Sequence, residues 1–451
     1  MGRKTTRREF LRNTAGAGVG FWVGSRALAE SRSPNERLAV AVVGIEGQGA
    51  WNIGQLVEAG ARIVALCDVD EPRTGKMRER FPDARFEVDY RRLLDRNGID
   101  AVLIATPDHH HAPATLRALA AGKHVYCEKP LTHTVEEARA VAEAARKHKR
   151  VTQMGTQIHA RSNYRRVVEV IRSGAIGPVG EVHVWVDRQW GGNERPKETP
   201  PVPEGLHYDL WLGPARERPY HPAYLPGSWR GWWDFGGGTL ADMGCHYTDL
   251  PFWALDLRVP ETIEAQGPPV HPESCPPWMI VRYRYAARGE QPAVKLTWYH
   301  GANKIPGRSD VPHPIPEELK SQIVRPPHFA EGKLPKWGDG VLFVGSKGML
   351  LADYDRYLLL PREQYEGYEP PPPSIPESIG HHREWIEACK TGDKTTCNFD
   401  YAGALTEAVL LGNVAYRSGK RLEWDARALR ARNAPEADRY LRHHYREGWA
   451  L

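Results

Sequence analysis

The sequence lacks an apolar run of about 18 residues, the length that a helix needs to cross the hydrocarbon core of a bilayer. We therefore expect no stable membrane span. The six cysteines form no C-x-x-C pair and no zinc-ligand spacing, so we expect mostly buried free thiols and no metal site. A disulfide between Cys389 and Cys397 is the alternative if the protein resides in an oxidising compartment. No internal repeat is evident.

A strong charge of either sign is also missing from most of the chain. The formal net charge of +5 arises in residues 1–29, which hold six basic side chains and one acidic one. The rest of the chain has equal numbers of Lys plus Arg and of Asp plus Glu. This balance argues against nucleic acid or anionic lipid as a partner.

The N-terminal segment has the features of an export signal. Thr6–Arg12 fits the twin-arginine pattern, a weakly apolar stretch follows at 15–23, and Ala27–Ala29 offers a small-x-small cleavage site. We therefore expect a twin-arginine signal peptide at 1–29 and a polar linker at 30–36. The twin-arginine export machinery would be a partner, and the location would be periplasmic or otherwise extracytoplasmic. A disordered basic tail is the alternative.

The 451 residues are enough for two domains. The first half alternates short apolar runs with helical patterns, which is typical of a parallel sheet covered on both faces. This pattern predicts a doubly wound domain at 37–154. We expect its strands at 38–43, 62–67, 101–105 and 124–127, and its helices from the first glycine turn to about residue 59 and near 72–80, 112–121 and 134–148.

The second half has a different pattern. Its apolar residues alternate with polar ones, which favours a mainly antiparallel sheet with one solvated face and flanking helices. This α+β domain is predicted at 155–451, with a long loop rich in Pro and Trp at 195–233. We expect its strands at 181–186, 279–286, 293–300, 341–345 and 349–353, and its helices near 162–173, 380–391 and 401–418.

A dinucleotide site is predicted where the first strand meets the first helix. Gly44, Gly47 and Gly49 with Gln48 form a turn whose backbone N–H groups suit a diphosphate. Glu46 departs from the usual glycine spacing. Asp68 ends the second strand, where a carboxylate binds the adenosine ribose hydroxyls and repels a 2′-phosphate, so NAD is favoured over NADP.

Further cofactor contacts are expected at the carboxyl ends of the next two strands. Thr106 and Pro107 follow one strand, and Glu128 and Lys129 end the other. Three consecutive histidines, 109–111, follow Pro107; because neighbouring side chains point in different directions, we expect no metal there. One of the three, His111, is expected to line the nicotinamide pocket.

Several motifs together resemble the glucose–fructose oxidoreductase, inositol dehydrogenase and MocA (Gfo/Idh/MocA) family. Glu128-Lys129-Pro130 matches its E-K-P signature, and the stretch from Gly236 to His246 matches a second motif. The resemblance continues at 155–157, 173–177 and 398–403 and covers essentially the whole mature chain. It implies an N-terminal Rossmann domain, a C-terminal domain with a large open sheet, and a homodimer or homotetramer.

Hydride transfer from a carbinol needs a base and a positive charge near the developing oxyanion. Lys129 would supply the charge. Asp242 and His246 are four residues apart, which puts both on one face of a helix. His246 would take the hydroxyl proton, and Asp242 would orient its imidazole or bind a substrate hydroxyl. The resemblance assigns the family's catalytic Asp and His to these two.

Candidate substrate contacts come from the second half. Nine Trp and Tyr residues gather between 185 and 233, and we expect one or two to stack on a sugar face and the others to pack in the interior. The candidates are Gln157, Arg161, Arg188, Tyr208 and Trp232.

The leading interpretation is an exported NAD(H)-dependent oxidoreductase acting on a sugar, sugar derivative or cyclitol. A second is a glycosidase or lyase that holds NAD tightly and uses transient oxidation and elimination, because an exported protein meets little fresh cofactor. A third is a non-catalytic nucleotide- or sugar-binding protein. It predicts that Lys129, Asp242 or His246 is missing, and all three are present.

Overall fold

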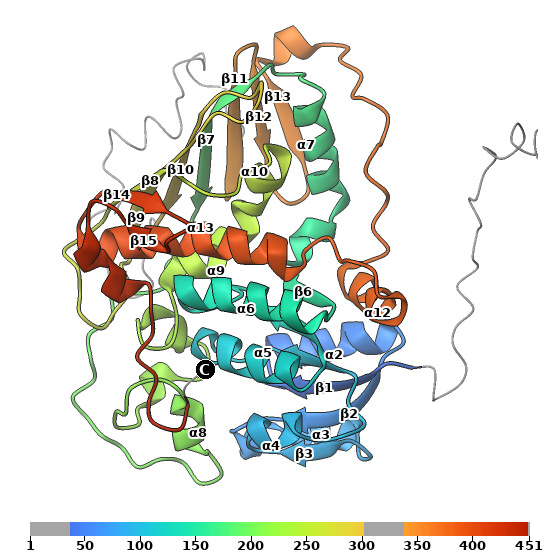
Figure 1. Ribbon diagram of the computed structural model, residues 1–451, viewed down its shortest axis with the longest axis vertical. Coiled ribbons are helices and arrows are strands. Elements are labelled where there is room, and N and C mark those ends of the chain that lie inside the picture. Colours follow the sequence, from blue (N-terminus) through green and yellow to red (C-terminus); the bar gives the residue numbers. More distant parts are fainter. Residues whose placement is uncertain (1–36, 302–337, 450–451) are drawn as a thin grey trace, which may run out of the picture. The chain divides into compact units, whose positions relative to one another are not determined.

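The computed structural model describes residues 37–301 and 338–449 (Figure 1). The expected signal peptide at 1–29 and linker at 30–36 lie outside the described residues and stay predictions. Among the described helices, none is both long and apolar enough to cross a membrane. All six cysteines are free thiols, so the bridge between Cys389 and Cys397 is not formed.

The first sheet is parallel throughout and has the strand order β3-β2-β1-β4-β5-β6. This is the order of a dinucleotide-binding doubly wound sheet, in which the ligand lies outside the carboxyl ends of the strands. The apolar runs of the sequence form the central strands because both faces of the sheet are covered. The strands are β1 (Ala39–Val43), β2 (Arg62–Cys67), β3 (Arg85–Glu87), β4 (Ala101–Ile104), β5 (His124–Glu128) and β6 (Thr152–Gly155).

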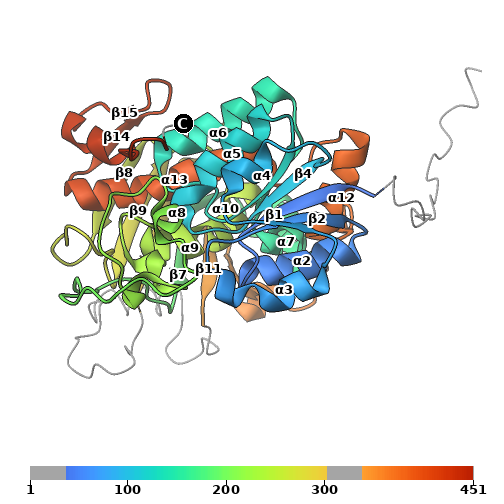
Figure 2. The ribbon, with the colours of Figure 1, turned by 90° about the horizontal axis from the view of Figure 1, so that it is seen from below.

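Helices cover both faces of this sheet. Figure 2 shows α2 and α3 on one face and α4, α5 and α6 on the other. The longest, α6, starts with a capping box in which Thr134 and Glu137 bond each other's backbone N–H groups. The helices are α2 (Gln48–Glu58), α3 (Gly75–Arg80), α4 (Tyr90–Leu94), α5 (His111–Ala120) and α6 (Val135–His148).

The second sheet has nine strands in the order β13-β12-β11-β7-β10-β9-β8-β14-β15. Its strands pair antiparallel except for β7 and β10, so the predicted mainly antiparallel sheet is confirmed. They are β7 (Val179–Val186), β8 (Thr262–Gln266), β9 (Met279–Tyr285), β10 (Val294–His300), β11 (Gly340–Gly345), β12 (Met349–Ala352), β13 (Tyr357–Leu360), β14 (Leu422–Asp425) and β15 (Arg430–Ala431).

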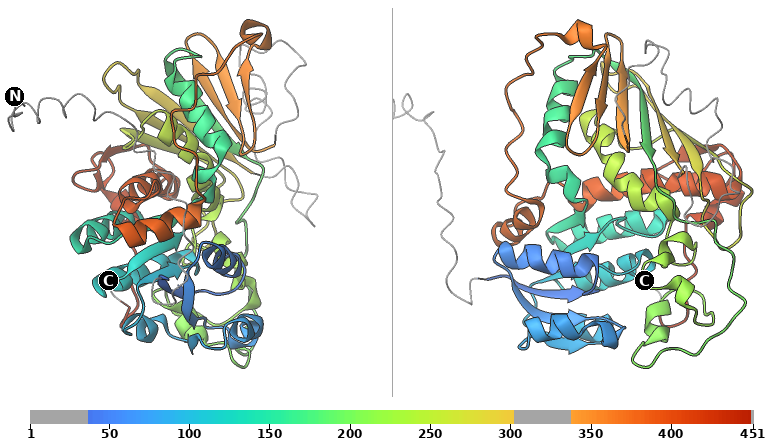
Figure 3. Two further views of the ribbon diagram at one scale, coloured as in Figure 1. Left: turned by 90° about the vertical axis from the view of Figure 1, so that its right-hand side faces the viewer. Right: turned by 180° about the vertical axis from the view of Figure 1, so that it is seen from behind.

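The helices of the second half pack around this sheet. Helices α9, α10 and α13 contact it, and α7 packs on α10 (Figure 3). The predicted loop at 195–233 contains one short α-helix, α8, and two 3-10 turns. The helices are α7 (Ser162–Arg172), α8 (Tyr208–Leu212), α9 (Gly238–Tyr247), α10 (Asp249–Ala254), α12 (His381–Thr391) and α13 (Phe399–Ser418).

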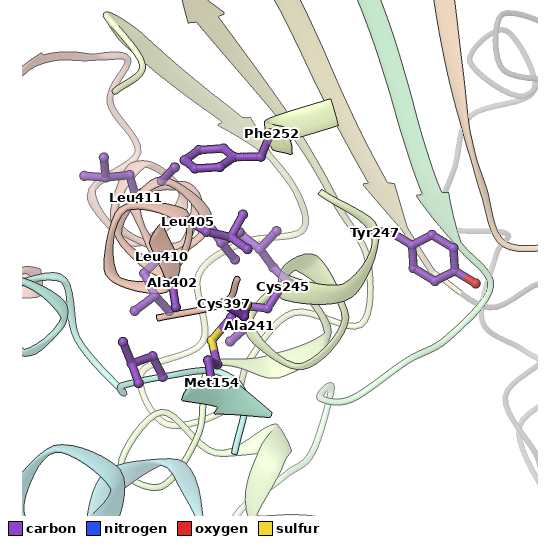
Figure 4. Packing of buried hydrophobic residues seen from close by; sticks show 14 of the residues in the cluster. Met154, Ala241, Cys245, Tyr247, Phe252, Cys397, Ala402, Leu405, Leu410 and Leu411 are labelled. Carbon is purple, nitrogen blue, oxygen red and sulfur yellow. The ribbon is translucent and has the colours of Figure 1, made fainter. Parts of the chain in front are cut away.

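Helix α9 is held in the core between the two sheets. Figure 4 shows Ala241 and Cys245 of α9 packed with Met154 of β6 and Leu405 of α13. Gly244 lets α9 approach α13 closely, since a Cβ at that position would lie 2.8 Å from Val409. The close packing fixes the position of Asp242 and His246, which the same helix carries.

Candidate functional site

A cavity of about 350 Å³ lies at the carboxyl ends of β1, β2, β4 and β5. One wall comes from the first sheet and includes most of the predicted cofactor residues. These are Gly44, Gly47, Gln48, Asp68, Thr106, Pro107, Glu128 and Lys129. The sheet edge therefore brings together residues that lie up to 85 positions apart in the sequence.

The glycine turn after β1 has no room for side chains at two positions. A Cβ on Gly49 would lie 1.9 Å from the carbonyl oxygen of Gly44, and one on Gly44 would lie 2.5 Å from the carbonyl oxygen of Ala105. Gly47 caps α2 with φ of 55° and lines the cavity. Glu46 also lines the cavity, and the turn still presents the N-terminus of α2 to it.

Asp68 ties the end of β2 to this turn. Its carboxylate accepts hydrogen bonds from Ile45 N at 3.0 Å and from Asp70 N at 3.1 Å. Burial raises the pKa of Asp68 in spite of these bonds. Asp70 also lines the cavity and lies 4.0 Å from Arg73. The Asp70 carboxylate therefore offsets the positive charge of Arg73 near Asp68.

The three histidines after β4 are buried and hold backbone groups together. His109 and His110 each bond the carbonyl oxygen of Trp211, at 3.0 and 2.8 Å. The ring of His111 lies between the carbonyl oxygens of Pro130 and Thr106, at 2.7 and 2.9 Å. Burial lowers the pKa values of His110 and His111 to about 4, so both are neutral near pH 7.

His111, predicted to line the nicotinamide pocket, is not among the residues that line this cavity. His111 opens α5, where its side chain turns inward, and His110 lines the cavity instead. Within 37–301 and 338–449, no group of three or more His, Cys, Asp or Glu side chains is arranged to hold a metal ion.

Glu128 is the centre of a buried amide network. Its carboxylate accepts hydrogen bonds from Asn52 Nδ2 and Gln157 Nε2, both at 2.9 Å, and from Gln48 Nε2 at 3.3 Å. Gln157, predicted as a substrate contact, is therefore a partner of Glu128. Gly155 leaves room for this carboxylate, because a Cβ there would lie 2.6 Å from it.

The centre of the predicted reaction site is a four-membered cluster around Asp242. Lys129 Nζ lies 2.6 Å and Arg230 Nε 3.1 Å from Asp242 Oδ1, and Trp190 Nε1 donates to Oδ2 at 2.8 Å. Burial alone would raise the pKa of Asp242, but the Lys129 and Arg230 cations outweigh burial and hold this pKa well below its usual range. Asp242 is therefore ionised.

His246 lies one helical turn after Asp242 but has a different partner. Its Nδ1 lies 3.2 Å from Thr156 Oγ1. Burial, followed by the charge of Lys129, lowers the pKa of His246 to about 3, so its imidazole is neutral near pH 7. The prediction that Asp242 orients this imidazole is corrected: α9 puts both on one face, and Thr156 fixes the ring.

The other substrate candidates lie outside this cavity. Arg161 pairs with Asp355 at the surface, and Arg188 is 57 % exposed beside Asp339 at 3.7 Å. Tyr208 and Trp232 are buried. Both belong to an aromatic cluster, named here the aromatic wall, which is formed by Tyr208, Trp211, Leu212, Ala215, Tyr224, Trp229, Trp232 and Phe235.

The aromatic wall faces the sheet edge across the cavity. Trp211 and Trp229 line the cavity, and the segment is anchored at one end where His207 N donates to the carbonyl oxygen of Val69 at 2.8 Å. Trp449 lines the cavity too and packs on Arg91, 4.0 Å from ring centre to guanidinium carbon.

The sequence-based prediction missed Arg230 and Trp449. The cluster of aromatic residues around Arg230 was a signal that this segment packs as a unit, whereas no local pattern marks Trp449.

The fold and the cavity define a dinucleotide-binding protein of the Rossmann class. The family model "Oxidoreductase family, NAD-binding Rossmann fold" matches residues 38–156, and the model of the same family's C-terminal alpha/beta domain matches residues 169–293. Together these matches cover more than half of the chain. The chain belongs to the Gfo/Idh/MocA family of oxidoreductases, as its motifs indicated.

Curated relatives match mainly the first half. Inositol 2-dehydrogenase of Rubrobacter xylanophilus is 38 % identical over 149 residues, which is 32 % of this chain and 43 % of the relative. The 1,5-anhydro-D-fructose reductase of Ensifer adhaerens is 27 % identical over 212 residues, 46 % of this chain and 53 % of the relative. The chain thus spans about half the length of these relatives or less.

Solved structures resemble the chain over most of its length. The WlbA dehydrogenase of Chromobacterium violaceum, in complex with NADH and UDP-GlcNAcA, has a TM-score of 0.59 at 18 % identity, covering 87 % of this chain and 98 % of the other. A levoglucosan dehydrogenase in complex with NADH and levoglucosan has a TM-score of 0.55 at 17 % identity, covering 85 % and 98 %. At these identities the likeness is one of fold.

Proposed function

We propose that this protein is an NAD(H)-dependent oxidoreductase that transfers hydride between the cofactor and a carbinol carbon of a sugar, sugar derivative or cyclitol. One observation carries the proposal: the cavity that Asp68 lines is also lined by Lys129, which forms an ion pair with Asp242. The names of the curated relatives, an inositol dehydrogenase and a sugar reductase, point to the same chemistry.

The residues of the cavity fit a dinucleotide. The side-chain-free turn of Gly44 and Gly49 leaves backbone for a diphosphate, and Asp68 stands where ribose hydroxyls are bound. Bound NAD would supply the hydride acceptor.

Lys129 donates to a hydroxyl at the reacting carbon and stabilises the negative charge that develops on its oxygen. His246 is neutral near pH 7, as a base must be, and accepts the hydroxyl proton. Asp242 holds Lys129 in place.

The cavity favours NAD over NADP because two carboxylates, Asp68 and Asp70, face one cation, Arg73. Asp68→Ala should weaken NAD binding and shift the ratio of NAD to NADP affinity by about 10-fold towards NADP, since it removes a ribose acceptor and a charge that repels phosphate. Fluorescence titration of both cofactors measures the ratio, with the exposed Asp83→Ala as control. Equal loss of both affinities would refute the ribose assignment.

The decisive experiment uses protein purified without added cofactor. The protein is denatured, and released nucleotide is identified and quantified by mass spectrometry. Stoichiometric NAD(H), or an empty protein that binds added NAD, would support the proposal. Failure to retain or bind either cofactor would contradict it and favour a different ligand.

The same experiment separates an exchanging dehydrogenase from the second candidate, an NAD-retaining glycosidase or lyase. The aromatic wall and Trp449 favour retention, because they face the sheet edge across the cavity and restrict the path by which a dinucleotide leaves. Stoichiometric retention would direct the substrate screen to glycosides. An empty protein would direct it to free sugars and polyols.

We also propose that the protein is exported through the twin-arginine pathway, on the sequence of Thr6–Arg12. Replacing both Arg7 and Arg8 by lysine should keep the protein in the cytoplasmic fraction. Unchanged export would contradict the proposal.

A further inference from the structure

Arg230 lines the cavity beside Lys129 and is held in place by Asp242. Its Nε donates to Asp242 Oδ1, and its Nη1 lies 3.4 Å from the carbonyl oxygen of Gly227. The guanidinium carbon is 4.3 Å from the ring centre of Trp229 and 5.6 Å from that of Trp190. Stacking between two aromatic rings fixes the plane of the group before any ligand arrives.

One nitrogen of this guanidinium, Nη2, is available to a ligand. Within the part of the chain that the structure describes, Nη2 makes no hydrogen bond, and the side chain is 27 % exposed where Arg230 lines the cavity. Lys129 lines the same cavity and shares Asp242 Oδ1 with Arg230. Two cations therefore meet at one carboxylate oxygen.

The cluster carries more positive than negative charge. Asp242 is one carboxylate for the two cations Lys129 and Arg230. Asp108 is also close, but it is buried, its Oδ1 has no hydrogen-bond partner, and burial raises its pKa to about 8, so it is neutral near pH 7. Glu128 bonds amides and the backbone N–H of Lys129, and its carboxylate acts on Lys129 through space, but it makes no bond to Arg230.

An unmatched positive charge in a largely desolvated site is costly unless a ligand supplies an anion. A guanidinium nitrogen held in a fixed plane pairs with a carboxylate oxygen in a defined direction, which the freely rotating ammonium of a lysine does not impose. The glycine turn already offers the N-terminus of α2 to a diphosphate, so the excess charge beside Lys129 is free for the substrate.

We propose that Arg230, beside Lys129, binds a carboxylate of the substrate, so that the preferred substrates are acidic sugars of the uronate class. This inference rests on the proposed function and narrows its substrate class. Arg230 is then a specificity-determining residue, and a neutral sugar leaves its Nη2 without a partner.

The test measures binding to the NAD⁺-loaded protein by intrinsic tryptophan fluorescence, to which Trp229 beside Arg230 contributes. The probes are two matched pairs: D-glucuronate with D-glucose, and D-galacturonate with D-galactose. In at least one pair the uronate should bind about 10- to 100-fold more tightly than its neutral partner. Arg230→Gln should reduce this ratio to near one, Arg230→Lys should retain part of it, and the exposed control Arg216→Gln should leave it unchanged.

Two outcomes would overturn the inference. In the first, neither uronate binds more tightly than its neutral sugar. In the second, Arg230→Gln weakens NAD⁺ binding and leaves the uronate preference intact, which would assign the anion to the diphosphate of the cofactor. Both readouts are binding constants and do not depend on turnover. A protein that binds uronates but does not turn over would count against the proposed function and not against carboxylate recognition.

Discussion

Lys129→Met should lower kcat by at least about 10³-fold while the protein keeps its fold and still binds NAD. The methionine side chain has a similar length but no charge, so the oxygen that becomes negative during hydride transfer loses its nearest donor. Asp242 keeps Arg230 and Trp190 as partners and is not left as a lone buried charge. The loss should therefore appear in kcat and not in stability.

The measurement combines steady-state kinetics with thermal unfolding and an NAD titration. The exposed Lys394→Met serves as a control for the removal of one positive charge. A variant that turns over within 10-fold of the parent protein would exclude the electrostatic role given to Lys129. A variant that no longer unfolds cooperatively would be replaced by Lys129→Gln, whose amide keeps a hydrogen bond to Asp242.

Asp108→Asn should stabilise the protein, and the gain should grow as the pH rises from 5 to 8. Burial raises the pKa of Asp108 to about 8, far above that of the same group in the unfolded chain. Between pH 4 and pH 8 the unfolded state loses this proton and the folded state keeps it. The favourable contribution of the neutral carboxyl is thus complete below about pH 4 and is lost as the pH rises.

Asparagine is neutral at every pH, so Asp108→Asn avoids this loss, and its amide oxygen keeps the hydrogen bond from Gly237 N. The expected gain at pH 7 is on the order of 3 kcal/mol. Thermal or urea unfolding at pH 5 and at pH 7.5 measures it, and the exposed Asp83→Asn is the control. A difference in stability that does not change with pH would mean that Asp108 titrates at its ordinary pKa.

The central strands of the first sheet could be predicted from the sequence because burial on both faces leaves an uninterrupted apolar run. The strand at 62–67 has the predicted limits. The edge strands could not be predicted in this way: β3 has three residues, none of them fully buried, and β15 has two. Their positions are set by a neighbouring strand and not by their own sequence.

Only part of the reaction site could be predicted from the sequence. The spacing of Asp242 and His246 correctly puts both on one face of a helix, since this depends only on helical geometry. Spacing along one helix does not specify partners from other segments. Thr156, which contacts His246, and Arg230, which contacts Asp242, come from elsewhere in the chain and are brought to the site by tertiary packing.

The aromatic wall is a hydrophobic cluster that is separate from the clusters in the two sheets. Substitutions of Trp211 or Trp229, which line the cavity, would reshape one side of it without changing a residue of either sheet. Natural selection can therefore test new substrate preferences in this segment while the cofactor turn and the reaction centre stay intact. The architecture thus separates the residues that shape this side of the cavity from those that form the two sheets.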